Sequence, residues 1–221
     1  MIDFDALLID RTKFINFKIQ EDSAYSCGWV GGNIPDFFVD NEHFFEQYRS
    51  NYYFYLSLEN PLNTEKMFSI FVPRDYNDLL KSMIYSECSI MIFEHDVAKE
   101  SLNSEFTNAS IEKHYISKGV ICDNFEPSYM DERDDDDDEF CEEEPFFIKF
   151  GGNPVLIQDE MSYSGSLHRD AFKFLFQIDE QGYDKEMIKG NYPFGFGSVY
   201  IYARIAEDNG VADVCAGYWM C

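Results

Sequence analysis

The chain has 221 residues, with 42 Asp or Glu against 17 Lys or Arg, so its formal net charge is −25. So few basic residues argue against nucleic acid as a ligand, because phosphate binding depends on Lys and Arg. Aromatic residues make up 18% of the chain, which is typical of a strand-rich protein with a large core, and no apolar run approaches the roughly 20 residues that span a bilayer.

The first half alternates short helical and strand patterns. Asn41 is a plausible N-cap for a helix that ends at Tyr48, because Phe44, Phe45 and Tyr48 then share one face. Helices are also predicted over 2–9, 75–84 and 108–116, and strands over 14–19, 52–58, 67–72 and 88–93.

The second half is dominated by strands. Residues 172–178 match the pattern of 52–58, and residues 198–204 correspond to 67–72. Residues 211–221 are predicted to form a hairpin around Gly217. The short connections favour antiparallel pairing, so we expect an α+β fold with mainly antiparallel sheets and a few short helices.

One phrase occurs twice, as Gly31-Gly32-Asn33 and Gly151-Gly152-Asn153. The same offset aligns further pairs, namely Arg49 with Arg169, Phe54 with Phe174, Leu58 with Ile178, and Glu59 with Asp179. We therefore expect two related halves, residues 1–122 and residues 145–221, with Phe54 and Phe174 buried in equivalent strands.

Residues 123–144 separate these halves and are predicted to be a flexible loop. The run 131–144 has eleven acids and one arginine, and like charges at this density repel one another. It contributes −10, which leaves −15 spread over the rest of the chain. A basic protein is the natural electrostatic partner, although acidity can also serve solubility alone.

Three strings of the second half carry a family resemblance: Gly151-Gly152-Asn153-Pro154, Phe174-Leu175-Phe176-Gln177-Ile178-Asp179 and Gly197-Ser198-Val199-Tyr200-Ile201-Tyr202. Their order and spacing over residues 148–205 resemble the YwqG-like family, a bacterial domain of unknown function. A Trp-Pro dipeptide common in that family is missing, and the first half has Ser57 where the second has Gln177. The resemblance implies a fold and no catalytic residues.

Gln177 is the first candidate site residue, since a glutamine at the centre of an apolar strand needs a buried partner. It can bond the Gly-Gly turn and fix its geometry, or contact a ligand together with Arg169 and His168. Glu59 and Asp179 can pair with Arg49 and Arg169 as internal salt links, or contribute to a site.

Chemical motifs are weak elsewhere. Glu94-His95-Asp96 is the best acid–base candidate, but strand alternation turns His95 away from the two acids. His168-Arg169-Asp170 has no nucleophile at a recognisable spacing, and Phe194-Gly195-Phe196-Gly197 lacks the rest of a phosphate loop. The acidic run lacks the glycine of an EF-hand loop, so we predict no metal, cofactor or catalytic residue.

Cysteine usage and the acidic N-terminus favour the cytoplasm. The cysteines lack the spacing of a metal knuckle or disulfide framework and are expected to be reduced; they are Cys27, Cys88, Cys122, Cys141, Cys215 and Cys221. The start Met1–Asp5 is acidic where a secretory signal is basic.

Together these features favour a non-catalytic protein that binds a basic protein partner, as an immunity protein binds a toxin, with no nucleic acid or membrane partner. The alternative is an enzyme or small-molecule-binding protein that uses a cleft between the halves near Gln177, Arg169 and His168. The sequence does not fix the oligomeric state.

Overall fold

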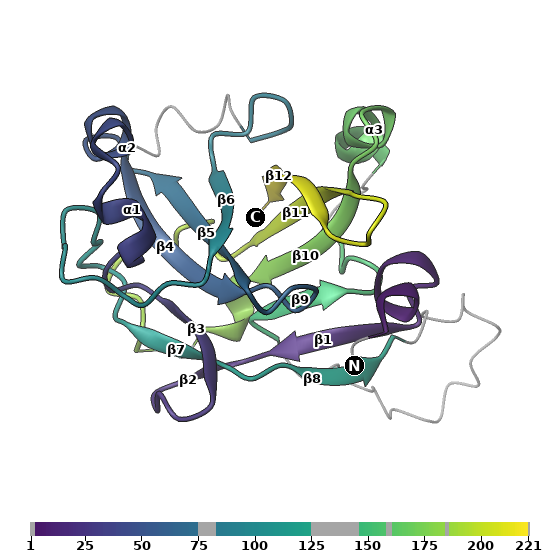
Figure 1. Ribbon diagram of the computed structural model, residues 1–221, viewed down its shortest axis with the longest axis horizontal. Helices are drawn as coiled ribbons and strands as arrows, with labels where there is room; N and C mark the ends of the chain where they lie inside the picture. The colour runs from purple at the N-terminus through teal and green to yellow at the C-terminus, as the bar shows by residue number, and fades with distance from the viewer. Residues whose placement is uncertain (1–2, 75–82, 125–145, 158–160, 184–185, 221) are drawn as a thin grey trace, which may run out of the picture.

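The computed structural model describes residues 3–74, 83–124, 146–157, 161–183 and 186–220, which fold into two antiparallel sheets with short helices (Figure 1). Sheet A has the order β12-β11-β10-β9-β1-β8, formed by Val211–Met220, Ser198–Ile205, Lys173–Asp179, Ile148–Gly151, Lys13–Phe17 and Val120–Asp123. Sheet B has the order β2-β7-β3-β4-β5-β6, formed by Ile19–Gln20, His114–Ser117, Ser26–Val30, Tyr52–Glu59, Lys66–Pro73 and Met91–Asp96. The predicted α+β class is confirmed.

The helical segments are short. They are η1 (Asp5–Ile9), α1 (Asp36–Val39), α2 (Glu42–Tyr48), α3 (Met161–Arg169) and η3 (Glu180–Gly182). The predicted cap of α2 is confirmed, because the Asn41 side chain accepts a 3.0 Å hydrogen bond from the backbone N–H of Phe44. This bond satisfies one of the N–H groups that the first turn of a helix leaves unpaired.

The two sheets are joined at one corner. Strand β1 runs on into β2, and β7 runs on into β8, so both segments pass from one sheet to the other. Gly119 lies at this corner, where a Cβ atom would come within 2.3 Å of the Ile15 side chain. Because β1 and β8 belong to sheet A, the sheets do not divide the chain at the boundary expected between residues 1–122 and 145–221.

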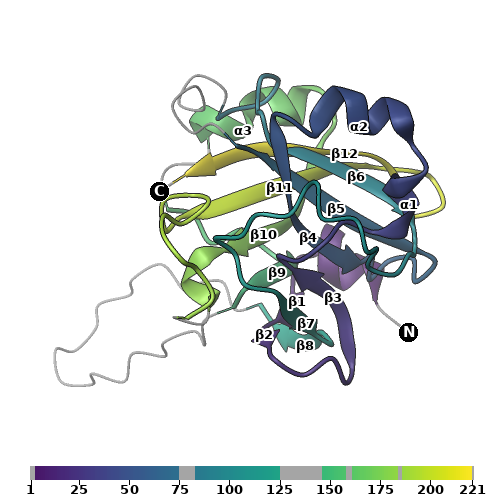
Figure 2. The ribbon, with the colours of Figure 1, turned by 90° about the vertical axis from the view of Figure 1, so that its left-hand side faces the viewer.

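Apolar side chains fill the space between the sheets and also their outer faces. Between the sheets, the rings of Phe68 and Phe176 lie 5.6 Å apart. Helices α1 and α2 cover an aromatic cluster on the outer face of sheet B, and α3 covers Tyr202 and Tyr218 on sheet A. Figure 2 shows α2 and α3 at the same end of the molecule.

Strand pairing follows the same register in the two repeated segments. Val30 pairs with Leu56 in sheet B, and Phe150, 120 residues after Val30, pairs with Phe176 in sheet A. An irregularity interrupts β4 at Tyr55 and β10 at Leu175, again 120 residues apart. Phe54 and Phe174 are buried strand residues, as expected. The duplication itself stays a prediction, which this shared register supports.

Two predicted elements are wrong. Residues 108–116 do not form a helix, because Ile111 bridges to Ile188 and residues from His114 onward form strand β7. Residues 211–220 form one strand and no hairpin. Gly217 is a bulge in that strand, and a Cβ there would lie 2.6 Å from the Tyr202 ring, so close packing and not a turn requires the glycine.

The helix predicted over 75–84 lies partly outside the described residues, and the acidic run lies wholly outside them. Of the helix expected over 75–84, only Met83 and Ile84 are described, and both contact the edge of β12. The acidic run 131–144 lies outside the described residues. The strand predicted over 88–93 begins later, at Met91.

Candidate functional site

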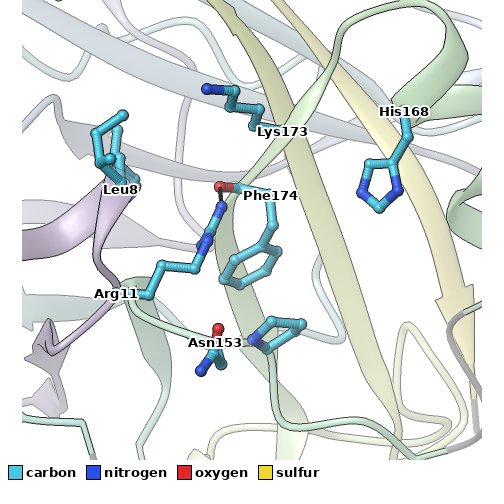
Figure 3. Close-up of a pocket in the computed structure, with 8 residues that line it drawn as sticks. Leu8, Arg11, Asn153, His168, Lys173 and Phe174 are labelled. Carbon is cyan, nitrogen blue, oxygen red and sulfur yellow. Dashed lines mark hydrogen bonds between the residues drawn. The ribbon is translucent and has the colours of Figure 1, made fainter. Parts of the chain in front are cut away.

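A cavity of about 370 Å³ opens beside the second Gly-Gly-Asn turn (Figure 3). Its lining comes from the end of η1, the turn, the end of α3 and the start of β10, and comprises Leu8, Ile9, Arg11, Asn153, Pro154, His168, Lys173 and Phe174. Its volume falls in the range of about 300 to 1,000 Å³ that is common for small-molecule sites. Three of these described lining residues are basic and none is acidic, in a chain of net charge −25.

Arg11 connects the second Gly-Gly-Asn turn to strand β10 through hydrogen bonds. Its guanidinium donates hydrogen bonds to the backbone oxygens of Gly152 and Phe174, the latter over 3.1 Å. It also lies 5.7 Å from the centre of the Phe174 ring. In Figure 3 the Arg11 side chain reaches from the segment after η1 to strand β10. A guanidinium held in this way keeps its positive charge at a fixed position.

The structure separates the three binding residues expected from the sequence. His168 lines the cavity, and its ring centre lies 6.4 Å from that of Tyr202. Arg169 is exposed at the end of α3 and is not among the described lining residues. Gln177 is fully buried; its Oε1 accepts from the N–H of Val155 over 2.9 Å, and its Nε2 donates to Ser198 over 3.0 Å. Gln177 therefore belongs to the core and anchors the segment just after the turn.

The expected salt links are wrong for two of the four residues. Arg49 pairs with Glu105, with 3.3 Å between the charged atoms. Asp179 accepts hydrogen bonds from the backbone N–H of Gln181 at 2.8 Å and from the hydroxyl of Ser198 at 3.0 Å. Burial raises the pKa of Asp179. Among the described residues its carboxylate is therefore held by neutral hydrogen-bond donors and not by an arginine.

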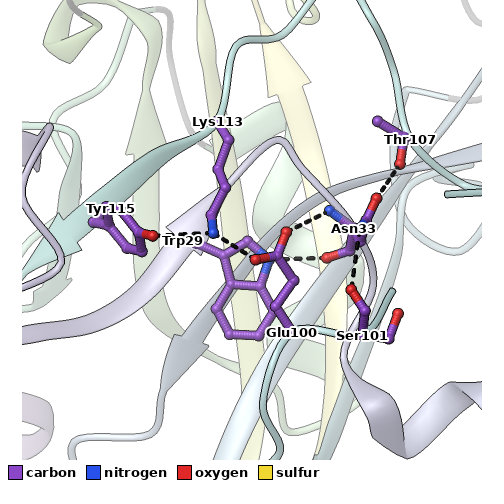
Figure 4. A network of polar contacts seen from close by, with 7 residues as sticks. All are labelled: Trp29, Asn33, Glu100, Ser101, Thr107, Lys113 and Tyr115. Atoms are coloured by element: carbon purple, nitrogen blue, oxygen red, sulfur yellow. Dashed lines mark hydrogen bonds and ion pairs between the residues drawn. The ribbon is translucent and has the colours of Figure 1, made fainter. Parts of the chain in front are cut away.

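The first Gly-Gly-Asn turn is closed by side chains of this same chain (Figure 4). The Glu100 carboxylate accepts a 2.9 Å hydrogen bond from the N–H of Asn33 and pairs with Lys113 over 2.5 Å. The Asn33 side chain donates to the Ser101 oxygen and accepts from Thr107. The amide oxygen and the amide nitrogen of Asn33 thus each have a partner within the protein.

The acid–base candidate Glu94-His95-Asp96 has a structural role. His95 is 3% exposed, contacts the Ser69 hydroxyl over 2.7 Å and stacks on Phe37 with 4.6 Å between ring centres. Asp96 pairs with Lys66 over 2.6 Å on the other side of the strand. Burial lowers the pKa of His95. The histidine is closed to solvent, so it offers no general base to a substrate.

Sequence reasoning missed the buried carboxylate of Glu180. It is 1% exposed and accepts hydrogen bonds from the backbone N–H groups of Phe194 at 2.8 Å, Phe196 at 2.7 Å and Gly197 at 3.3 Å. Burial raises its pKa to about 7. The glycine-bearing loop 194–197, considered above as a partial phosphate loop, thus uses its N–H groups to bind an internal carboxylate.

A second candidate site lies on α1 and α2. Four carboxylates and no Lys or Arg occur between Asp36 and Glu46. Exposed apolar side chains accompany them, with Phe37 48% and Val39 36% exposed. The neighbouring segment 96–102, held by a 2.8 Å hydrogen bond from the Asp36 N–H to the Lys99 oxygen, adds more exposed apolar area. We call this set the acidic surface; its residues are Asp36, Phe37, Val39, Asp40, Glu42, Glu46, Val97 and Leu102.

Comparison with protein-family models, curated proteins and solved structures finds no significant match to this chain. The YwqG-like resemblance therefore stays an expectation. Within the described ranges, no cluster of His, Cys, Asp and Glu side chains could hold a metal ion. In the same part of the chain, no helix has the length and apolarity to cross a membrane.

Proposed function

We propose that this protein is a non-catalytic, cytoplasmic binding protein that recognises a basic protein partner, such as a toxin that it neutralises as an immunity protein. The observation that carries the proposal is the acidic surface on α1 and α2. There, residues 36–46 combine four carboxylates with the exposed side chains of Phe37 and Val39 and contain no Lys or Arg, while the adjoining segment 96–102 contributes one exposed lysine, Lys99.

The composition of this surface fits protein recognition. Interfaces commonly combine a few aromatic anchors with a charged rim, and complementary charge speeds the encounter of the partners. Phe37 is supported from below, because its ring packs against His95 and lies 5.2 Å from that of Phe38. A preorganised aromatic side chain loses little conformational entropy when a partner covers it.

The test begins with isolation of partners from the native cell and continues with binding kinetics of the recovered protein. In one variant the four acids of the surface are neutralised, by Asp36→Asn, Asp40→Asn, Glu42→Gln and Glu46→Gln. The matched control neutralises four exposed acids elsewhere, by Glu21→Gln, Glu87→Gln, Glu186→Gln and Glu207→Gln. Both variants have the same net charge, so a difference between them reports where the partner binds.

The expected result is a basic partner whose association rate falls by roughly tenfold or more between low and physiological salt. The surface variant should associate more slowly than the matched control, with a smaller effect on dissociation. Equal rates for the two variants, or a partner without net positive charge, would contradict the proposal.

A further inference from the structure

The two Gly-Gly-Asn turns have the same backbone form and different surroundings. Gly31 and Gly32 have φ angles of 64° and 71°, and Gly151 and Gly152 have 74° and 63°. In each turn one glycine N–H donates to a backbone oxygen, that of Gly31 to Tyr55 and that of Gly152 to Leu7. In the first turn the N–H of Asn33 donates to the carboxylate of Glu100.

The second turn has no corresponding carboxylate among the described residues. A Cβ on Gly32 would meet the Glu100 carboxylate at 2.6 Å, whereas a Cβ on Gly152 would meet the neutral amide of Asn124 at 3.0 Å. That amide donates to the backbone oxygen of Arg11. Asn153 instead borders the cavity of about 370 Å³.

The lining of this cavity has two chemical parts. Lys173 and the fixed guanidinium of Arg11 give it positive charge, and Asn153 and His168 add polar groups. Leu8, Pro154 and Phe174 provide apolar wall. In the region that the structure describes, neither Lys173 nor His168 has an ion-pair partner. Positive charge beside apolar wall suits an anion that bears an apolar group.

We propose that this cavity binds the carboxylate of a small organic acid with an apolar tail. Asn153 holds the carboxylate, as Asn33 holds that of Glu100 in the first turn. Arg11 and Lys173 supply positive charge in the lining, and Leu8, Pro154 and Phe174 cover the tail. The same carboxylate chemistry occurs in a free metabolite and at the C-terminus of a peptide. The site is independent of the acidic surface, so either proposal can fail without the other.

The test is an NMR titration of the ¹⁵N-labelled full chain with four probes. Hexanoate and hexanamide differ only in the carboxylate, and acetyl-Ala-Leu with a free or an amidated C-terminus tests the peptide source. We expect binding in the millimolar range, typical of ligands of this size. The charged probes should shift the amide resonances of Gly152 and Asn153, and the neutral probes should not. Tighter binding of hexanoate identifies a free acid, and tighter binding of the peptide identifies a chain terminus.

Variants locate the bound carboxylate. Lys173→Met should weaken hexanoate binding by about fivefold or more, because it removes a positive charge from the cavity lining. Lys99→Met removes an exposed lysine outside the cavity and should leave the affinity unchanged. Asn153→Asp, which preserves side-chain shape, should abolish binding by charge repulsion. Equal shifts with hexanamide, no shifts at Gly152 and Asn153 well above millimolar hexanoate, or equal weakening by both lysine variants would overturn the proposal.

Discussion

Glu180 and Phe196 are joined by a 2.7 Å hydrogen bond in which a buried carboxylate accepts from a backbone N–H. Phe194 and Gly197 donate to the same carboxylate, so one side chain determines the path of the loop that leads into β11. Since burial raises the pKa of this group to about 7, its protonation changes in the neutral pH range.

The stability of the protein relative to a Glu180→Gln variant should fall as pH rises from about 4.5 to about 7 and then level off. The folded-state pKa of about 7 lies above the ordinary value of 4.5, so the folded protein keeps a proton that the unfolded chain releases. Between pH 4.5 and 7 the free energy of unfolding of the wild type should therefore fall by on the order of 3 kcal/mol relative to that of the variant. Urea unfolding of both proteins between about pH 4.5 and 8 measures the two stabilities. A wild-type stability that stays constant or rises relative to that of the variant over this range would refute the assignment.

Removal of the Gln177 side chain should destabilise the fold. Gln177→Ala leaves the N–H of Val155 and the hydroxyl of Ser198 without their partner and opens a void, which together cost about 2 to 4 kcal/mol. The exposed Gln181 is the matched control, and Gln181→Ala should stay within about 0.5 kcal/mol of the wild type. Chemical denaturation compares the two, and similar losses would show that Gln177 is not a core residue.

Two phenylalanines should separate stability from binding. Phe106 is fully buried against Phe44 and Phe71, with ring centres 5.4 and 5.6 Å apart, so Phe106→Ala should cost about 3 to 5 kcal/mol of stability. Phe37 is half exposed, so Phe37→Ala should cost about 1 kcal/mol of stability or less. The same variant should bind a basic protein partner with lower affinity. Thermal unfolding and binding kinetics of both variants test this pair. A large stability loss in Phe37→Ala would place it in the core.

The thiol of Cys27 should react slowly. Burial, reinforced by the negative charge of Glu59, raises its pKa to about 12, and the thiolate is the reactive form. Alkylation near pH 8 should therefore be slower than that of glutathione by roughly a hundredfold or more. Site-resolved mass spectrometry after timed labelling measures the rate, and labelling as fast as glutathione would show that the thiol is not buried.

Local sequence signals predicted the parts of the fold that depend on local chemistry. The cap of α2 follows from Asn41 and the aromatic spacing behind it, and β4 and β10 follow from alternation around Phe54 and Phe174. The predictions failed where tertiary packing decides. Gly217 reads as a turn residue, yet the Tyr202 ring that requires it comes from the neighbouring strand.

The candidate sites could be predicted only in part. His168 was recognised and Lys173 follows it closely in sequence, but the cavity also needs Leu8, which is far from both and reaches them only through the pairing of β1 with β9 and of β9 with β10. No local pattern announces that Glu180 meets the N–H groups of a loop fourteen to seventeen residues later. The sequence predicted acidity spread over the chain but did not single out residues 36–46, because the exposure of Phe37 beside these acids required the structure.

The passage of β1 into β2 and of β7 into β8 has a consequence for a cleaved chain. A cut between residues 124 and 146 leaves β1 and β8 on one fragment and β9 to β12 on the other, so neither fragment contains all of sheet A. The exposed edges of β1 and β9 would then be complementary templates for each other. The two fragments should therefore behave as a split protein, unfolded or aggregated when separate and native when mixed.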